Sequence, residues 1–188
     1  MGVLDKVRNT DVVVLDVETS GLDWKTNYIV GYVITTGPAP EDTYYIPVRH
    51  RTANLYDWEP PIEGVAGFLK KHPFEDHLEE ALVGKHVIGH NLAFDLKFMH
   101  RHDIDVRRSY SLENCCIDAG VQPKRGGPMY EYLAEKFGGP VASKQMGNLW
   151  KLDGDDKMGI EYAMGDGIST WQLWADQQKD LDDQNLRV

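Results

Sequence analysis

Two carboxylates stand where the first apolar run of the chain ends. Asp16 and Glu18 follow the run 12–15, and side chains alternate along a strand, so both project from one face. Two like charges this close are unfavourable unless a cation lies between them or one carboxylate takes up a proton. Oxygen ligands without a neighbouring Cys or His pair favour hard cations, so the pair predicts a Mg²⁺ or Mn²⁺ site.

A third acid, Asp95, lies one turn into a segment that is expected to be helical from Asn91 to about residue 102. The positive end of the helix dipole favours its charge. By itself, Asp95 fits a site residue and an acid that serves only its own helix equally well. His90 is interpreted as a packing or capping residue rather than a ligand.

Tyr162 and Asp166 are four residues apart in a helix expected from about residue 159 to 178, so they lie on one face. Gly165 and Gly167 flank Asp166, and each costs about 1 kcal/mol relative to alanine inside a helix. Close approach of a metal, a substrate or another backbone would explain both glycines. The alternative is a surface acid beside two glycines that serve packing.

Apolar patterning and turn residues indicate the elements that must position these side chains. Strands are expected at 11–18, 28–36, 43–48 and 85–88, and the first three form an antiparallel meander. Helices are expected at 61–71, 91–102, 130–137 and 159–178. This order predicts an α/β fold with a mixed sheet flanked by helices. Segment 141–158 has no clear pattern.

Composition narrows the class of protein. The 188 residues, 41% of them hydrophobic, are typical of one globular domain over 1–188, with 180–188 as a frayed tail. With no long apolar run and no apolar amino terminus, we expect a cytoplasmic monomer without a membrane span or signal peptide. The adjacent Cys115 and Cys116 disfavour a disulfide and fit a reducing compartment. A net charge of -10 opposes polyanion binding unless bound metals reverse the field locally.

Together, these motifs resemble those of the DEDD superfamily of 3′-5′ exonucleases. The matching segments are Asp16-x-Glu18, Gly89-His90-Asn91-x-x-x-Asp95 and Tyr162-x-x-x-Asp166. They are most similar to the tyrosine-bearing (DEDDy) branch and to the proofreading domain of family A DNA polymerases, because Glu161 replaces the histidine of the other branch. The resemblance covers about 11–173 and implies a ribonuclease-H-like fold.

The resemblance also implies roles for individual residues. Four carboxylates would be catalytic and bind two divalent ions, Mg²⁺ or Mn²⁺: Asp16, Glu18, Asp95 and Asp166. Tyr162 would position the attacking water. Three residues would contact the terminal nucleotides: Thr19, Leu22 and Asn91. Asp118 falls where such families often hold a further supporting acid, whereas no counterpart is identified for the aromatic residue beside the 3′ end.

The expected reaction is phosphodiester hydrolysis from the 3′ end of DNA, preferentially single-stranded, by a two-metal-ion mechanism. Three basic clusters could contact the rest of the strand: Arg49-His50-Arg51, Arg107-Arg108 and Lys124-Arg125. A separate DNA polymerase or another replication or repair protein is an expected partner.

Two alternatives stay open. One is an exoribonuclease resembling ribonuclease D, which would use the same carboxylates on RNA. The other is a non-catalytic module that binds nucleic-acid ends or a polymerase. The presence of all four carboxylates and of Tyr162 disfavours the second alternative.

Overall fold

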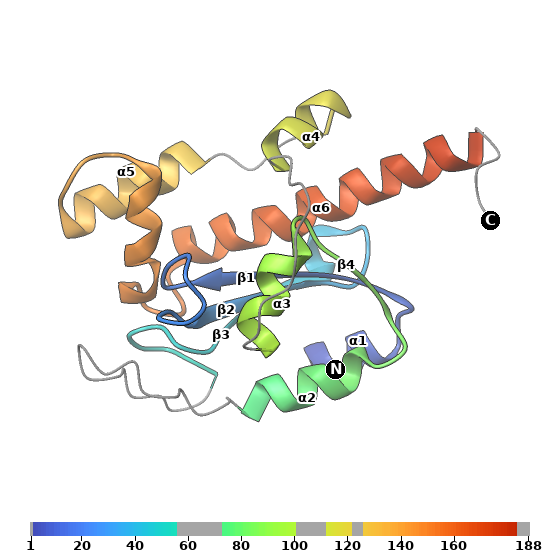
Figure 1. The fold of residues 1–188 in the computed structure, drawn as a ribbon, viewed down its shortest axis with the longest axis horizontal. Coiled ribbons are helices and arrows are strands. Elements are labelled where there is room, and N and C mark those ends of the chain that lie inside the picture. The colour runs from blue at the N-terminus through green and yellow to red at the C-terminus, as the bar shows by residue number, and fades with distance from the viewer. Residues whose placement is uncertain (1, 56–72, 101–111, 122–125, 184–188) are drawn as a thin grey trace.

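One four-stranded sheet forms the centre of the molecule (Figure 1). The computed structural model describes residues 2–55, 73–100, 112–121 and 126–183. The strands lie in the order β3-β2-β1-β4. Their bounds are β1 Val12–Thr19, β2 Ile29–Thr35, β3 Thr43–Pro47 and β4 His86–Ile88. β1, β2 and β3 run antiparallel, and β4 pairs with β1 in parallel, so the predicted mixed α/β sheet is confirmed.

Helices follow and flank these strands. Their bounds are α1 Val3–Arg8, α2 Pro73–Leu82, α3 Leu92–His100, α4 Leu112–Asp118, α5 Gly126–Phe137 and α6 Lys157–Asp183, with 3-10 helices η1 Pro40–Asp42 and η2 Ser143–Lys151. The helix expected at 61–71 lies outside the described residues. α6 continues to Asp183, so residues 180–183, expected in a frayed tail, belong to the helix. None of the described helices combines the length and apolar character needed to cross a membrane.

One face of the sheet carries the main hydrophobic core. Val13, Leu15 and Val17 alternate along β1 toward this face and are almost completely buried. They pack with residues of α1, α2 and α3 that include Val7, Phe74, Leu78 and Phe98. Figure 1 shows α1 and α2 on this side of the sheet and α6 on the other.

The opposite face is covered by α6, and Gly167 sets how closely the helix approaches. A Cβ atom at Gly167 would lie 2.6 Å from Thr35 Oγ1 and 2.7 Å from Val33 Cγ1, both on β2. Any side chain there would push the helix away from the sheet. The close approach expected beside Asp166 is therefore, at Gly167, an approach to side chains of the sheet rather than to a metal, substrate or backbone.

Candidate active site

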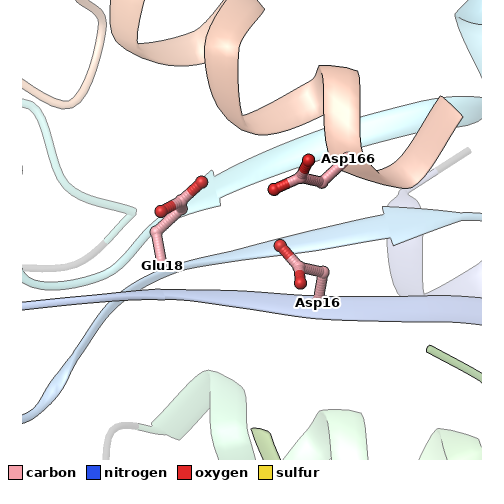
Figure 2. A group of neighbouring side chains, drawn as sticks. All are labelled: Asp16, Glu18 and Asp166. Atoms are coloured by element: carbon pink, nitrogen blue, oxygen red, sulfur yellow. The ribbon is translucent and has the colours of Figure 1, made fainter. Parts of the chain in front are cut away.

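Three carboxylates from distant parts of the chain meet on the α6 face of the sheet. Asp16 and Glu18 come from β1 and Asp166 from α6, and one oxygen of each lies within 4.8 Å of the others. Figure 2 shows the carboxylates directed toward a common space between strand and helix. Glu18 is only 8% exposed. The structure thus brings together three of the four acids expected in the metal site.

The local structure explains this convergence. Strand alternation places Asp16 and Glu18 on the same face of β1, as the sequence predicted. Asp166 immediately precedes Gly167, the residue that lets α6 lie directly on β2. The helix therefore brings the Asp166 carboxylate down to the strand without an intervening side chain.

This donor set fits a divalent cation. All three ligands are carboxylate oxygens, which hard cations such as Mg²⁺ and Mn²⁺ prefer. Three negative groups held this close repel one another, and a cation between them removes the repulsion. Within the described part of the chain, no other group of His, Cys, Asp or Glu has this geometry.

Asp95 lies beside the three acids but has a structural task of its own. Its carboxylate is 2% exposed, and Oδ1 accepts a hydrogen bond from the backbone N–H of Val17 at 2.8 Å. β4 pairs with β1 only along Val12–Val14, so this amide lies beyond the parallel ladder. Asp95 thus satisfies a backbone donor between the two strand residues that carry the other acids.

The electrostatic setting of Asp95 links it to the same site. Burial raises the pKa of Asp95 to about 7, the hydrogen bond from Val17 opposes this rise, and the negative charges of Glu18 and Asp166 add to it. Asp95 is therefore within electrostatic reach of the acids on both elements. A cation bound among them would lower its pKa again.

Tyr162 lies one turn before Asp166 on α6, on the same face of the helix. Its partly buried ring packs against a second hydrophobic cluster. That cluster comprises Met129, Leu133, Leu149 and Leu152, from α5, η2 and the residue after η2. Residues 141–158, which had no clear sequence pattern, thus contribute to the support of Tyr162.

A pocket of about 360 Å³ contains two of the residues predicted to contact nucleotides, Leu22 and Asn91. Leu22 is 85% exposed on the turn after β1, where the Thr19 hydroxyl donates a hydrogen bond to Gly21 O at 2.8 Å. Asn91 adopts a left-handed conformation, with φ of 54°, before the first turn of α3. Asp23, Trp24, Phe94, Phe98 and Lys97 also line the pocket.

The aromatic residues of this pocket were missed at the sequence level. Trp24 stands two residues after Leu22, and Phe94 stands next to Asp95. Their closeness to predicted site residues was the available signal. The sequence pattern of such a residue is the same as that of a core residue, and Trp24 and Phe94 also pack against the main core.

Asp118 is the last residue of α4, and its side chain lies outside the described residues. The same helix carries Cys116, which is buried. Burial raises the pKa of the Cys116 thiol, and the charges of Cys115 and Asp166 add to the rise. α4 packs against α6, the helix that carries Asp166, and the supporting role of Asp118 stays a prediction.

The expectation that Arg49-His50-Arg51 forms a basic surface is wrong for two of its residues. Arg49 is 3% exposed, and its Nη1 lies 2.7 Å from Glu75 Oε1 in a buried ion pair. His50 is 1% exposed, and burial lowers its pKa to about 4. Arg51 is exposed beside Asp153. The clusters at 107–108 and 124–125 lie outside the described residues.

Solved structures show a similar fold. One, described as the apo form of a nuclease, has a TM-score of 0.54 and 16% identity over 98% of this chain and 80% of that chain. This likeness confirms the predicted ribonuclease-H-like α/β fold. Brucella melitensis NrnC with bound Mg²⁺ has a TM-score of 0.47 and 17% identity over 95% of this chain and 77% of that chain.

Sequence comparison identifies the family. The chain is 25% identical over 205 residues to DNA polymerase DpoZ of Salmonella phage PMBT28, and the match covers 99% of this chain. It spans 29% of the length of that polymerase. Residues 2–182 match the 3′-5′ exonuclease family. Together with the acid cluster, this match confirms the resemblance inferred from the motifs: the chain belongs to the 3′-5′ exonuclease family.

Proposed function

We propose that this protein is a metal-dependent 3′-5′ exonuclease of the DEDDy type that removes nucleotides from the 3′ ends of DNA, preferentially single-stranded. The observation that carries this proposal is the convergence of Asp16, Glu18 and Asp166 within 4.8 Å on a chain of the exonuclease family. Asp95 adjoins this group through Val17. These four acids are the catalytic carboxylates.

The carboxylates would hold two divalent ions, Mg²⁺ or Mn²⁺. Such ions lower the pKa of a water molecule and stabilise negative charge on a leaving oxygen. Tyr162 orients the attacking water through its hydroxyl group. A phenol with a pKa near 10 is almost entirely protonated at pH 7, so Tyr162 acts as a hydrogen-bonding residue and not as the base.

The pocket around Leu22 takes the terminal nucleotide. Leu22 follows Glu18 by four residues and Asn91 precedes Asp95 by four, so the pocket adjoins the segments that carry the acids. Trp24 and Phe94 offer aromatic surfaces for a base, and Lys97 offers a positive charge for a phosphate. A base must leave its duplex partner to enter such a pocket, which favours single-stranded ends.

The preference for DNA rests on the phage DNA polymerase relative. The same relative supports a DNA polymerase as a working partner. The same acids could also act on RNA, because phosphodiester hydrolysis at a metal site does not itself select the sugar. The substrate test therefore compares the two sugars directly.

The deciding experiment follows the degradation of 5′-labelled oligonucleotides of one sequence: single-stranded DNA, single-stranded RNA and duplex DNA. Each is incubated with Mg²⁺, Mn²⁺ or a chelator. We expect stepwise shortening from the 3′ end and release of mononucleotides with either metal, fastest on single-stranded DNA, and none with chelator. A 3′-phosphorylated oligonucleotide controls for the need for a free 3′ end.

Each other outcome would favour a different function for this protein. Faster shortening of RNA would favour the exoribonuclease alternative. Binding without degradation in either metal would favour the non-catalytic module. Cleavage at internal positions would contradict an exonuclease altogether.

A further inference from the structure

A second tyrosine lies on the carboxylate face of the sheet. Tyr45 on β3 pairs with Val33, which pairs with Asp16, and paired residues project from the same face of a sheet. In the neighbouring row, Glu18 pairs with Gly31. A Cβ atom at Gly31 would collide with the ring and hydroxyl of Tyr45, so the phenol lies across this glycine. Gly31 therefore lets Tyr45 reach toward Glu18.

The Tyr45 hydroxyl stays neutral in this position. Burial raises the pKa of Tyr45, and the negative charges of Glu18 and Asp16 raise it further. Ionisation would place another negative charge beside the acids. The side chain instead presents an uncharged oxygen at the site.

The hydrogen-bond partners of His50 fix the direction in which Tyr45 donates. His50 Nδ1 lies 3.1 Å from the carbonyl oxygen of Leu152, and Nε2 lies 2.6 Å from Tyr45 Oη. A carbonyl oxygen only accepts, so Nδ1 carries the hydrogen. Burial keeps His50 neutral, which leaves a lone pair on Nε2. Tyr45 therefore donates to His50, and its own oxygen is left as an acceptor.

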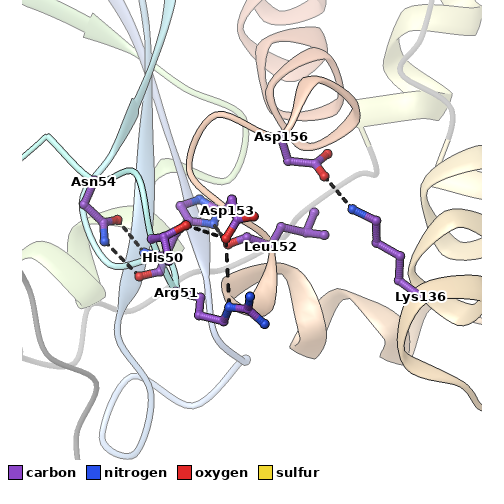
Figure 3. A network of polar contacts seen from close by, with 8 residues as sticks. His50, Arg51, Asn54, Lys136, Leu152, Asp153 and Asp156 are labelled. Atoms are coloured by element: carbon purple, nitrogen blue, oxygen red, sulfur yellow. Dashed lines mark hydrogen bonds and ion pairs between the residues drawn. The ribbon is translucent and has the colours of Figure 1, made fainter.

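The hydrogen bonds of Tyr45 and His50 end at Leu152, in the segment that leads into α6 (Figure 3). Arg51 N donates to Trp150 O at 2.9 Å and Gly154 N donates to Thr52 O at 2.8 Å, which joins the segments on either side of the His50–Leu152 contact. Asp156 then caps α6 by accepting from Gly159 N at 3.0 Å. The chain from Tyr45 through His50 to Leu152 thus connects the Glu18 face to the start of the helix that carries Asp166.

We propose that Tyr45 and His50 form a positioning pair for the metal site. The inference rests on the proposed function and deepens it. The Tyr45 hydroxyl donates its hydrogen bond to His50, so toward the site its oxygen can only accept one. The donor would be a water molecule held between Tyr45 and the acids. The pair also fixes the distance between β3 and the start of α6. Neither residue exchanges a proton with the substrate.

Tyr45→Phe tests the pair, because it keeps the ring over Gly31 and removes only the hydroxyl. In the full chain we expect kcat on single-stranded DNA to fall about 10-fold and Mn²⁺ affinity, titrated without nucleic acid, to weaken about 10-fold, with KM unchanged. Tyr44→Phe is the matched control. The Tyr44 hydroxyl bonds to Lys6 on the opposite face, so both quantities should stay at the wild-type value.

A second pair of variants separates positioning from folding. Glutamine at position 50 can accept from Tyr45 and donate to Leu152, so His50→Gln should retain most of the kcat, whereas His50→Leu should resemble Tyr45→Phe. In the ¹⁵N NMR spectrum of the wild type, Nδ1 of His50 should carry the hydrogen. Unchanged kcat and Mn²⁺ affinity in Tyr45→Phe, or a hydrogen on Nε2, would overturn the proposal.

These measurements keep the two proposals apart. If the wild type degraded no oligonucleotide, the proposed function would fail, whereas the Mn²⁺ titration and the tautomer of His50 would still decide the role of the pair.

Discussion

The two faces of β1 are both covered, but they differ in chemistry. On one face, Val13, Leu15 and Val17 pack into an apolar core with α1, α2 and α3. On the other, the apolar character ends at Val14, and Asp16 and Glu18 follow beneath α6. The apolar face anchors the strand in the core, and the acidic face of the same strand holds like charges close together.

Under the proposed function, stability and activity are carried by different residues of one strand. Burial of apolar side chains stabilises the fold, whereas three clustered carboxylates oppose it unless a cation binds. Substitutions on the acidic face should therefore lower nuclease activity but not stability, and substitutions on the apolar face should lower stability but not activity. Residues that set the contact between the sheet and α6 should affect both activity and stability.

Asp16→Ala should give the largest effect. We expect a loss of nuclease activity of about 1000-fold or more, because a proposed metal ligand is removed, with an unchanged or slightly higher free energy of unfolding without metal. Initial rates on single-stranded DNA and urea denaturation measure the two quantities. Asp11→Ala, an exposed acid just before β1, is the matched control and should change neither. Retained activity in Asp16→Ala would contradict the site.

Leu15→Ala should have the opposite signature. Leu15 is 1% exposed in the core, so the free energy of unfolding should fall by about 3 kcal/mol. The specific activity of the folded fraction should stay near that of the wild type. Leu15→Val should show a smaller loss of the same kind. A drop in activity without a drop in stability would show that the two faces are not separable.

Acid should destabilise the protein through His50. Between pH 6.5 and about 4, the unfolded chain binds a proton at His50 that the folded chain does not, so the free energy of unfolding falls as the pH is lowered. From pH 7 to 4.5 this contributes a loss of about 2 kcal/mol. His50→Gln should lose this contribution, whereas His86→Gln, at an exposed histidine, should keep it. The free energy of unfolding is measured by urea denaturation at a series of pH values. The same dependence on pH in the wild type and in His50→Gln would refute the role of His50.

Gly167→Ala should modestly reduce both the stability and the nuclease activity. The new methyl group would press on Thr35 and Val33 and move α6 away from the sheet. We expect a loss of about 1 to 2 kcal/mol in the free energy of unfolding and a several-fold lower kcat, because Asp166 moves with the helix. Gly127→Ala, in α5 and with no neighbour within 4 Å of the new Cβ, should leave kcat unchanged and raise the free energy of unfolding by up to about 1 kcal/mol. An active, stable Gly167→Ala protein would mean that the helix tolerates displacement.

Most of the sheet could be predicted from local patterns. All four strands and the helices α3, α5 and α6 correspond to predicted segments, because β-branched runs, turn glycines and apolar spacing encode them locally. α2 was missed although Phe74, Leu78 and Ala81 have helical spacing. η2 was missed because its residues pack against α5, a contact that no local pattern reveals.

The candidate site was predictable only in part. The common face of Asp16 and Glu18 follows from strand alternation. Their approach to Asp166, 148 residues after Glu18, depends on tertiary packing, and only the resemblance to a family suggested it. Arg49 and His50 were misassigned to the surface because charge alone does not reveal burial. Their partners, Glu75 and Leu152, come from other segments of the chain.

The hydrogen bond from Val17 to Asp95 has a practical consequence for trapping a substrate complex. Alanine at position 95 would remove the charge and also leave a backbone amide in the sheet without its acceptor. Asparagine keeps a carbonyl oxygen at that place. Under the proposed function, Asp95→Asn is therefore the substitution of choice for an inert yet intact protein that could be crystallised with an uncleaved oligonucleotide.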